Sequence, residues 1–218
     1  MPLTTIQIET AANPTVSVIW MHGLGADAND FVPLLKELDL TGCPAIRFVF
    51  PNAPRIPISI NGGMVMPGWY DIRNADIVSR EDETGLRQSQ AAIDELIQIE
   101  QARGAQKIIL AGFSQGCAMA LQTGLRQSSQ LAGLLCLSGY LPLVQTVAKE
   151  RHLINQGIPI FMAHGTIDPV IAIARAEQSR DVLIQLGYAV QWHAYTMQHT
   201  LSWEEIVEIS AWFRKVLA

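Results

Sequence analysis

The residues best suited to chemistry lie in the segment 110–122, which reads LAGFSQGCAMALQ. Ser114 stands there between Gly112 and Gly116, with G-x-S-x-G spacing. A β-rich run, KIILA, precedes the serine and a helix-like run follows it. This context is typical of a nucleophile elbow, a tight strand-to-helix turn that exposes a serine hydroxyl and needs small neighbours. The pattern predicts that Ser114 is a nucleophile.

A serine hydroxyl is a weak nucleophile without a neighbouring base. His199 is the best candidate, because it lies in the short TMQH loop between the last strand-like run and the last helical run. A loop can bring an imidazole over the serine. The alternatives are weaker, since His152 lies in a polar helix, His193 lies inside a strand, and His164 ends a strand and shapes a turn.

The imidazole in turn needs an acid that fixes its tautomer. Asp168, in AHGTIDPV, follows the end of a strand-like run. An aspartate before proline also commonly shapes a turn. However, the order Ser114, Asp168, His199 is the order of α/β-hydrolases. Asp94 precedes the serine and Asp181 lies within a helix, so neither competes well.

Backbone N–H groups that hold an oxyanion are expected at two places. Gln115 begins the helix after the serine, where the N–H groups are unpaired and the helix dipole favours an anion. Leu24 lies in MHGLGADAND, a glycine-bearing loop after an early strand, and such a loop can offer a second donor. A phosphate-binding loop is the alternative there, but Gly23 and Gly25 are too few glycines and no lysine follows.

These side chains require a parallel sheet to bring them together. Short apolar runs, typical of strands that are buried on both faces, predict strands at 16–20, 46–50, 107–111, 133–137, 158–163 and 189–195. An edge strand is expected near 6–10. Helical patterns lie between them, at 31–38, 86–102, 116–125, 144–154, 173–186 and 202–216. The alternation predicts one α/β domain over 1–218, a mostly parallel twisted sheet with helices on both faces. Residues 51–84 are rich in Pro, Gly and Asn, which predicts a long, irregular loop. A loop of that length usually has a function.

Composition limits the function classes. The 218 residues are 49% apolar and 16% charged, and the net charge is −5. This mild charge gives no basic surface for nucleic acid or anionic lipid. Two uncharged stretches, 108–125 and 127–148, contain Ser, Gln, Gly and Pro throughout, which favours buried strands and helices over a membrane helix. The N-terminus resembles no secretory signal, and Cys43, Cys117 and Cys136 form no disulfide or metal pattern, so we expect a cytoplasmic protein.

Together, these segments resemble the phospholipase/carboxylesterase family of small α/β-hydrolases, which includes bacterial carboxylesterases and acyl-protein thioesterases. The matching segments span most of the chain in family order: HGLGAD (22–27), FVFPNAP (48–54), INGGMVMPGWYDI (60–72), GFSQG (112–116), HGTID (164–168) and MQH (197–199). Two positions depart from the usual pattern. Cys117 replaces a common glycine and adds bulk at the start of the helix. Gln198 replaces a glycine before the histidine, which stiffens the loop or narrows the entrance to the site and so affects the size of the substrate.

The resemblance implies an α/β-hydrolase fold and a serine hydrolase with no metal and no cofactor. A chain of 218 residues is also too short for a large separate lid domain. The resemblance assigns Ser114 as nucleophile, His199 as general base and then acid, and Asp168 as its orienting group. It also points to Met66 and Trp69 as walls of the acyl pocket, although core packing explains each equally well. The partner is a small ester or thioester substrate, without nucleic acid or stable membrane insertion, and the chain is a monomer or weak homodimer.

We therefore predict a carboxylesterase for short-to-medium acyl esters or thioesters. A lysophospholipase or acyl-protein thioesterase for long acyl chains is the alternative. A catalytically silent hydrolase-fold binding protein is a more remote one, because such proteins usually lose a member of the triad. Cys117 as a second nucleophile is a further, weaker possibility.

Overall fold

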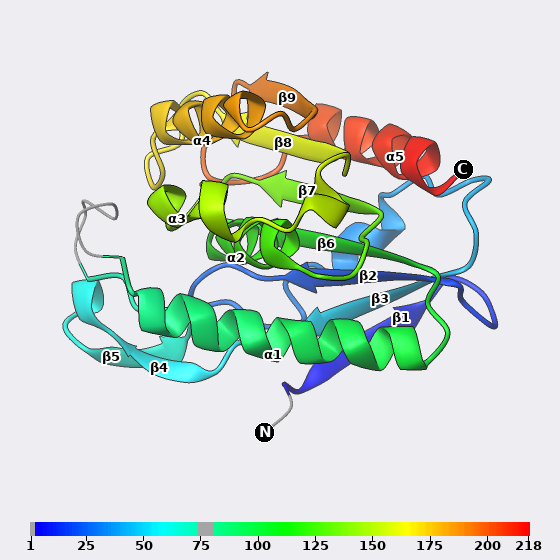
Figure 1. Cartoon of the computed structure of the whole chain (residues 1–218), viewed down its shortest axis with the longest axis horizontal. Helices are drawn as coiled ribbons and strands as arrows, with labels where there is room; N and C mark the ends of the chain where they lie inside the picture. The colour runs from blue at the N-terminus through cyan, green and yellow to red at the C-terminus, as the bar shows by residue number, and fades with distance from the viewer. Residues whose placement is uncertain (1–2, 74–80) are drawn as a thin grey trace.

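A computed structural model describes residues 3–73 and 81–218. Its centre is a sheet of seven strands in the order β1-β3-β2-β6-β7-β8-β9 (Figure 1). Strand β1 runs antiparallel to β3 at one edge, and every other pairing in this sheet is parallel. The strands are β1 (Thr5–Glu9), β2 (Val16–Met21), β3 (Ile46–Pro51), β6 (Lys107–Phe113), β7 (Gly133–Leu137), β8 (Ile160–Gly165) and β9 (Val190–Tyr195). The predicted strands and the mostly parallel sheet are confirmed.

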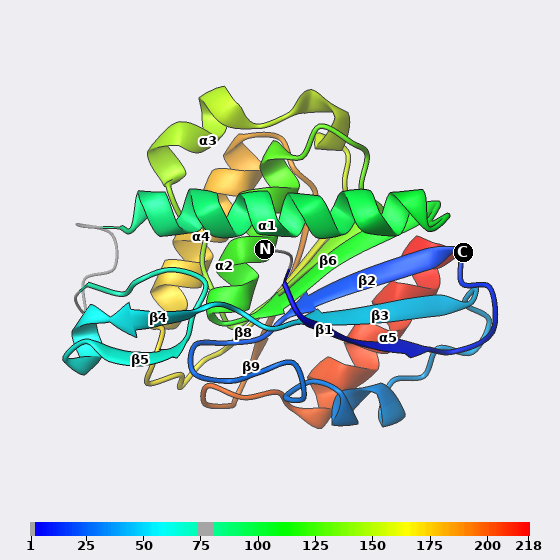
Figure 2. The same ribbon diagram turned by 90° about the horizontal axis from the view of Figure 1, so that it is seen from below.

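Helices cover both faces because successive side chains of a strand point to opposite faces. In β2, Ile19 and Met21 pack into a core shared with α1 (Glu83–Ala102), α2 (Gln115–Arg126), α3 (Val144–Glu150) and α4 (Ile173–Gln185). Val18 and Trp20 face the opposite core, which α5 (Trp203–Leu217) and the 3₁₀ helix η1 (Pro33–Lys36) complete. Figure 2 shows α1 and α5 on opposite sides of the sheet.

Two predicted helices are shorter than the sequence pattern indicates. The helix expected at 31–38 is only the 3₁₀ turn η1, in which proline occupies the first position. The helix expected at 144–154 ends at Glu150, because Arg151 adopts an extended conformation with φ −60° and ψ 138°. A separate 3₁₀ turn, η3 (Leu153–Asn155), follows it.

The segment expected to be an irregular loop contains a hairpin. Strands β4 (Arg55–Ile58) and β5 (Met64–Pro67) pair antiparallel, and the 3₁₀ turn η2 (Ser59–Asn61) joins them. Gly62 and Gly63 close the turn at φ 66° and 81°, where glycine is strongly favoured. Residues 74–80 of the predicted loop lie outside the described residues. In both views the hairpin lies beside the beginning of α1 (Figures 1 and 2).

The cysteines are all free thiols. Cys117 and Cys136 are buried as expected, whereas Cys43 is half-buried. Along the described ranges, no helix is both long enough and apolar enough to cross a bilayer.

Candidate active site

Ser114 occupies a strained turn between β6 and α2. Its φ of 56° and ψ of −116° form a combination that a side-chain-bearing residue rarely adopts and that costs about 1–3 kcal/mol. The crossing is close on both sides of the serine. A Cβ at Gly112 would overlap the Gly116 carbonyl, and a Cβ at Gly116 would overlap the Met21 carbonyl. The glycines of G-x-S-x-G are therefore required by backbone contact, as the sequence predicts for an elbow.

His199 and Asp168 form a hydrogen-bonded pair beside this elbow. His199 Nδ1 lies 2.7 Å from Asp168 Oδ2, and the carboxylate side chain is fully buried. The imidazole packs on Phe113, the residue before the serine, with ring centroids 4.7 Å apart. Because the carboxylate can only accept, Nδ1 carries the proton and Nε2 is left with a lone pair. That tautomer is the one a general base requires.

The carboxylate of Asp168 is held at both oxygens. Its Oδ1 accepts hydrogen bonds from the backbone N–H groups of Val170 (2.8 Å) and Ile171 (2.9 Å). Burial alone raises the pKa of this carboxyl group, but the hydrogen bonds from His199 and from those two N–H groups outweigh burial and lower it. Asp168 is therefore an anion at neutral pH, and its orientation is fixed independently of His199.

His164, which the sequence analysis treats only as a turn residue, is a further member of this cluster. Its side chain is fully buried, with Nε2 2.8 Å from the Ile171 carbonyl oxygen and 3.4 Å from Asp168 Oδ2. Burial lowers the pKa of His164, so the ring is neutral and donates from Nε2. The imidazole thus supports the turn that carries Asp168. The HG pair at the end of β8 is the signal that could have indicated this contact.

The two expected oxyanion donors lie next to the serine. A Cβ placed on Gly23 would lie only 3.4 Å from the Ser114 Cβ, so the loop that carries Leu24 touches the elbow. Neither the Leu24 N–H nor the Gln115 N–H donates to a protein acceptor within residues 3–73 and 81–218. The Gln115 N–H also begins α2, where the helix dipole favours negative charge. This arrangement is suited to holding an oxyanion.

His22 and Trp69 fix the shape of the Leu24 loop. His22 Nδ1 donates to the Gly23 carbonyl oxygen (2.7 Å), while its Nε2 accepts from the Ala53 N–H (3.0 Å). Burial lowers the pKa of His22, which keeps the ring neutral and able to accept. Trp69 Nε1 donates to the His22 carbonyl oxygen at 2.9 Å. The loop is therefore held by buried hydrogen bonds to two other segments.

Of the two possibilities left open for Trp69, its burial favours core packing. Only 1% of Trp69 is exposed, because its indole packs under the Leu24 loop. Its backbone N–H donates to Gln115 Oε1 (2.8 Å), and Gln115 Nε2 donates to the Tyr70 carbonyl oxygen (2.7 Å). Trp69 is therefore a supporting residue, and the Gln115 side chain clamps residues 69 and 70 to the elbow.

Met66 lies where a substrate contact is expected. It is half-buried on β5, and a Cβ on Gly25 would lie 3.8 Å from its sulfur. The Gly25 N–H also donates to the Pro67 carbonyl oxygen at 2.8 Å, which joins the Leu24 loop to the hairpin. Met66 therefore borders the loop that carries Leu24, one of the two expected oxyanion donors.

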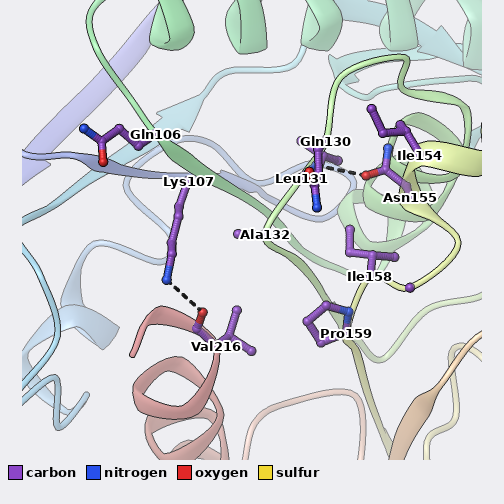
Figure 3. A pocket seen from close by; sticks show the side chains of 11 residues that line it. Gln106, Lys107, Gln130, Leu131, Ala132, Ile154, Asn155, Ile158, Pro159 and Val216 are labelled. Carbon is purple, nitrogen blue, oxygen red and sulfur yellow. Dashed lines mark hydrogen bonds between the residues drawn. The ribbon is translucent and has the colours of Figure 1, made fainter.

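A second cleft lies at the opposite, N-terminal ends of β6, β7 and β8 (Figure 3). Its volume is about 430 Å³, and two of its polar side chains, Lys107 and Asn155, already have partners. Lys107 Nζ donates to the last carbonyls of α5, and Asn155 Oδ1 accepts from the Leu131 N–H at 2.9 Å. This cleft offers structural hydrogen bonds and no nucleophile.

Comparison with known proteins identifies the family of this chain. The family model described as Phospholipase/Carboxylesterase matches residues 4–217. The chain therefore belongs to the phospholipase/carboxylesterase family of α/β-hydrolases, whose members are serine hydrolases acting on ester or thioester bonds. Within that class it is similar to acyl-protein thioesterase 1 of Yarrowia lipolytica, with 37% identity over 98% of this chain and 97% of that protein.

Two further relatives support the same placement. Acyl-protein thioesterase 1 of Gibberella zeae is 38% identical over 95% of this chain and 93% of its own length. The crystal structure of Zea mays acyl-protein thioesterase 2 superposes with a TM-score of 0.89 at 26% identity, covering 99% of both chains. These comparisons confirm the predicted family and the α/β-hydrolase fold.

Proposed function

We propose that this chain cleaves acyl thioesters and carboxylic esters through an acyl-enzyme on Ser114, with His199 as base and Asp168 as its orienting group. The observation that carries the proposal is the 2.7 Å His199–Asp168 hydrogen bond next to the strained serine turn. A buried anion, an imidazole whose Nδ1 faces that anion, and a strained turn that carries the serine together match the requirements of acyl transfer.

In this mechanism, His199 Nε2 accepts the Ser114 proton as Oγ attacks the carbonyl carbon. The Leu24 and Gln115 N–H groups receive the negative charge that develops on the carbonyl oxygen. His199 then protonates the departing alcohol or thiol, and water clears the acyl group by the same route. Loss of one oxyanion donor costs about 10²–10³ in rate in comparable sites.

Acyl-protein thioesters are the substrate class that the relatives favour, since those cited above are named acyl-protein thioesterases. A carboxylesterase for short-to-medium acyl chains is the second candidate. The half-buried Met66 beside the Leu24 loop supports an apolar acyl site. The length of that site will determine which acyl chain length is hydrolysed fastest. We further propose that residues 1–218 form a single domain.

The test is a set of thioesters and p-nitrophenyl esters of increasing acyl length, assayed with wild type, Ser114→Ala and Ser128→Ala. Ser128 is exposed and serves as the matched control. We expect turnover by wild type and Ser128→Ala and none above background with Ser114→Ala. A peak at long acyl chains supports the thioesterase, and a peak at short chains supports the carboxylesterase. Equal rates in all three proteins contradict the nucleophile assignment.

We also infer a cytoplasmic location and a monomeric or weakly dimeric state. The three free thiols support a reducing compartment, where disulfides are rare. Cell fractionation and light scattering at increasing protein concentration test the two inferences separately.

A further inference from the structure

A pocket of about 420 Å³ adjoins His199 on the side of Phe113. The segment around η1, the residue before the nucleophile and the loop after His199 form its walls. Its lining consists of aromatic and aliphatic side chains, one threonine, two carboxylates and the imidazole itself: Asp30, Phe31, Pro33, Leu34, Glu37, Phe113, His199, Thr200 and Leu201. The mechanism described above leaves this pocket without a role.

The chemistry of acyl transfer indicates which part of a substrate this pocket receives. The leaving oxygen or sulfur must take its proton from His199 Nε2, so it must lie within hydrogen-bond reach of that atom. The carbonyl oxygen is directed toward the Leu24 and Gln115 N–H groups instead. Whatever is attached to the leaving atom therefore extends into the space next to His199. The pocket beside Phe113 and Leu201 is such a space.

Two aromatic rings line this pocket beside His199. The Phe31 and Phe113 ring centroids are 5.7 Å apart, and the Phe113 centroid lies 4.7 Å from that of His199. Aromatic faces attract cations through the ring quadrupole. An apolar wall alone also accepts a neutral group, so the sign of the charge at the rim decides the preference.

That charge is negative. Asp30 and Glu37 are exposed lining residues, and neither forms an ion pair within the described ranges. The lining contains no lysine or arginine. Lys36 precedes Glu37 in the chain without lining the pocket, and the nearby Asp39 is paired with Arg214. The negative charge of Asp30 also acts at the loop that carries Leu24. It raises the pKa of His22 in that loop and so partly offsets the lowering caused by burial.

We propose that this pocket is the leaving-group site and that it favours an alcohol or thiol carrying a positive charge close to the scissile bond. The inference rests on the proposed function, since it concerns the same catalytic centre. In the favoured reaction, the Ser114 Oγ–acyl bond forms as the acyl carbon–sulfur bond breaks. The thiolate takes the proton that His199 received from Ser114, and the cationic thiol leaves through the pocket.

The test compares three thioesters that share a butyryl group and differ in the leaving thiol. Thiocholine carries a positive charge, 3,3-dimethylbutanethiol is its neutral isostere, and 3-mercaptopropionate carries a negative charge. Loss of thioester absorbance gives kcat/KM at low and high salt. Hydrolysis of the neutral thioester that disappears in Ser114→Ala establishes the proposed function independently of any charge preference. No turnover of any thioester contradicts the proposed function itself.

The double variant Asp30→Asn/Glu37→Gln removes both rim charges and leaves the described catalytic residues intact. The matched control is Glu95→Gln/Asp181→Asn, which removes two negative charges from helices α1 and α4. A unit charge about 7 Å away in water changes binding about threefold. We therefore expect wild type and control to prefer the cationic over the neutral thioester about fivefold to tenfold at low salt. High salt should largely remove this preference because it screens exposed charges.

In the rim variant, the ratio of cationic to neutral kcat/KM should fall toward one. Equal ratios in the rim variant and the control overturn the proposal, as does a wild-type preference for the neutral or the anionic thioester. A second arm uses S-butyryl-cysteine peptides flanked by arginine or by glutamate. Faster cleavage of the arginine peptide shows that a peptide can supply the positive charge on the leaving thiol. Faster cleavage of the glutamate peptide contradicts the proposal.

Discussion

Replacing Asp168 with asparagine tests whether this residue sets the tautomer of His199. Asparagine has the same shape but presents one acceptor and one donor. The Asp168 Oδ1 position faces the N–H groups of Val170 and Ile171, at 2.8 and 2.9 Å. Those backbone donors cannot change their protonation, so the amide oxygen must take that position. The amide NH₂ then faces His199 Nδ1.

The consequence for His199 follows from the 2.7 Å contact with Asp168 Oδ2. An NH₂ at that position requires Nδ1 to accept, which moves the ring proton to Nε2. The imidazole then has no lone pair for the Ser114 proton. A wrong tautomer of this kind lowers kcat by about 10⁴ in a comparable triad, equivalent to about 5 kcal/mol of transition-state stabilisation.

The assay is kcat and KM for a neutral thioester, combined with thermal unfolding and nitrogen NMR of the imidazole. The control variant is Asp181→Asn, on the exposed side of α4. We expect Asp168→Asn to fold like wild type, to show the proton on Nε2, and to lose about 10³–10⁴ in kcat with little change in KM. Activity within tenfold of wild type, in a protein with the wild-type unfolding temperature, would refute the tautomer argument.

Three further predictions follow from buried contacts. Replacing His164 with phenylalanine removes its donor to the Ile171 carbonyl, so steady-state kinetics should show kcat reduced about 10- to 100-fold at similar KM; an unchanged kcat contradicts a supporting role. Burial raises the pKa of Glu205 to about 8, above the ordinary value of 4.5, so the folded state binds more protons and stability falls as pH rises between these values. Between pH 6 and pH 9 wild type should lose about 3 kcal/mol from this group, and urea unfolding of Glu205→Gln should lack that loss. Gly116→Ala would place a methyl group against the Met21 carbonyl, and we expect a fall in the unfolding temperature with loss of activity; wild-type stability and activity would contradict the close approach.

The sequence by itself determined most of the sheet and the identity of the chemically important residues. Apolar runs predicted the strands because parallel strands buried on both faces must be apolar throughout. The serine turn was recognisable because a tight crossing demands glycine on both sides. His199 and Asp168 were identifiable because their places after successive strands bring them to the same edge. All of this information is local or follows from chain order.

The sequence misjudged features that depend on packing between distant segments. The β4–β5 hairpin was missed because Pro57 and Pro67 argue against strands, although edge strands tolerate proline. The sequence left open whether Trp69 lines a pocket or packs in the core, and only the fold shows that its indole donates to the His22 carbonyl oxygen, next to the Leu24 loop. No local pattern distinguishes an aromatic residue that lines a groove from one that lies beneath it.

The tertiary structure also decided which groups act on one another. His164 touches Asp168 because the turn after β8 folds back over the end of its own strand. The pocket beside His199 exists because residues from η1, β6 and the loop after β9 meet there. Hydrogen bonds and charges act over a few ångströms, and the three segments that form this pocket are separated by more than seventy residues of chain. The proximity of these segments is therefore a property of the assembled fold, whereas the chemical types of their residues are known from the sequence.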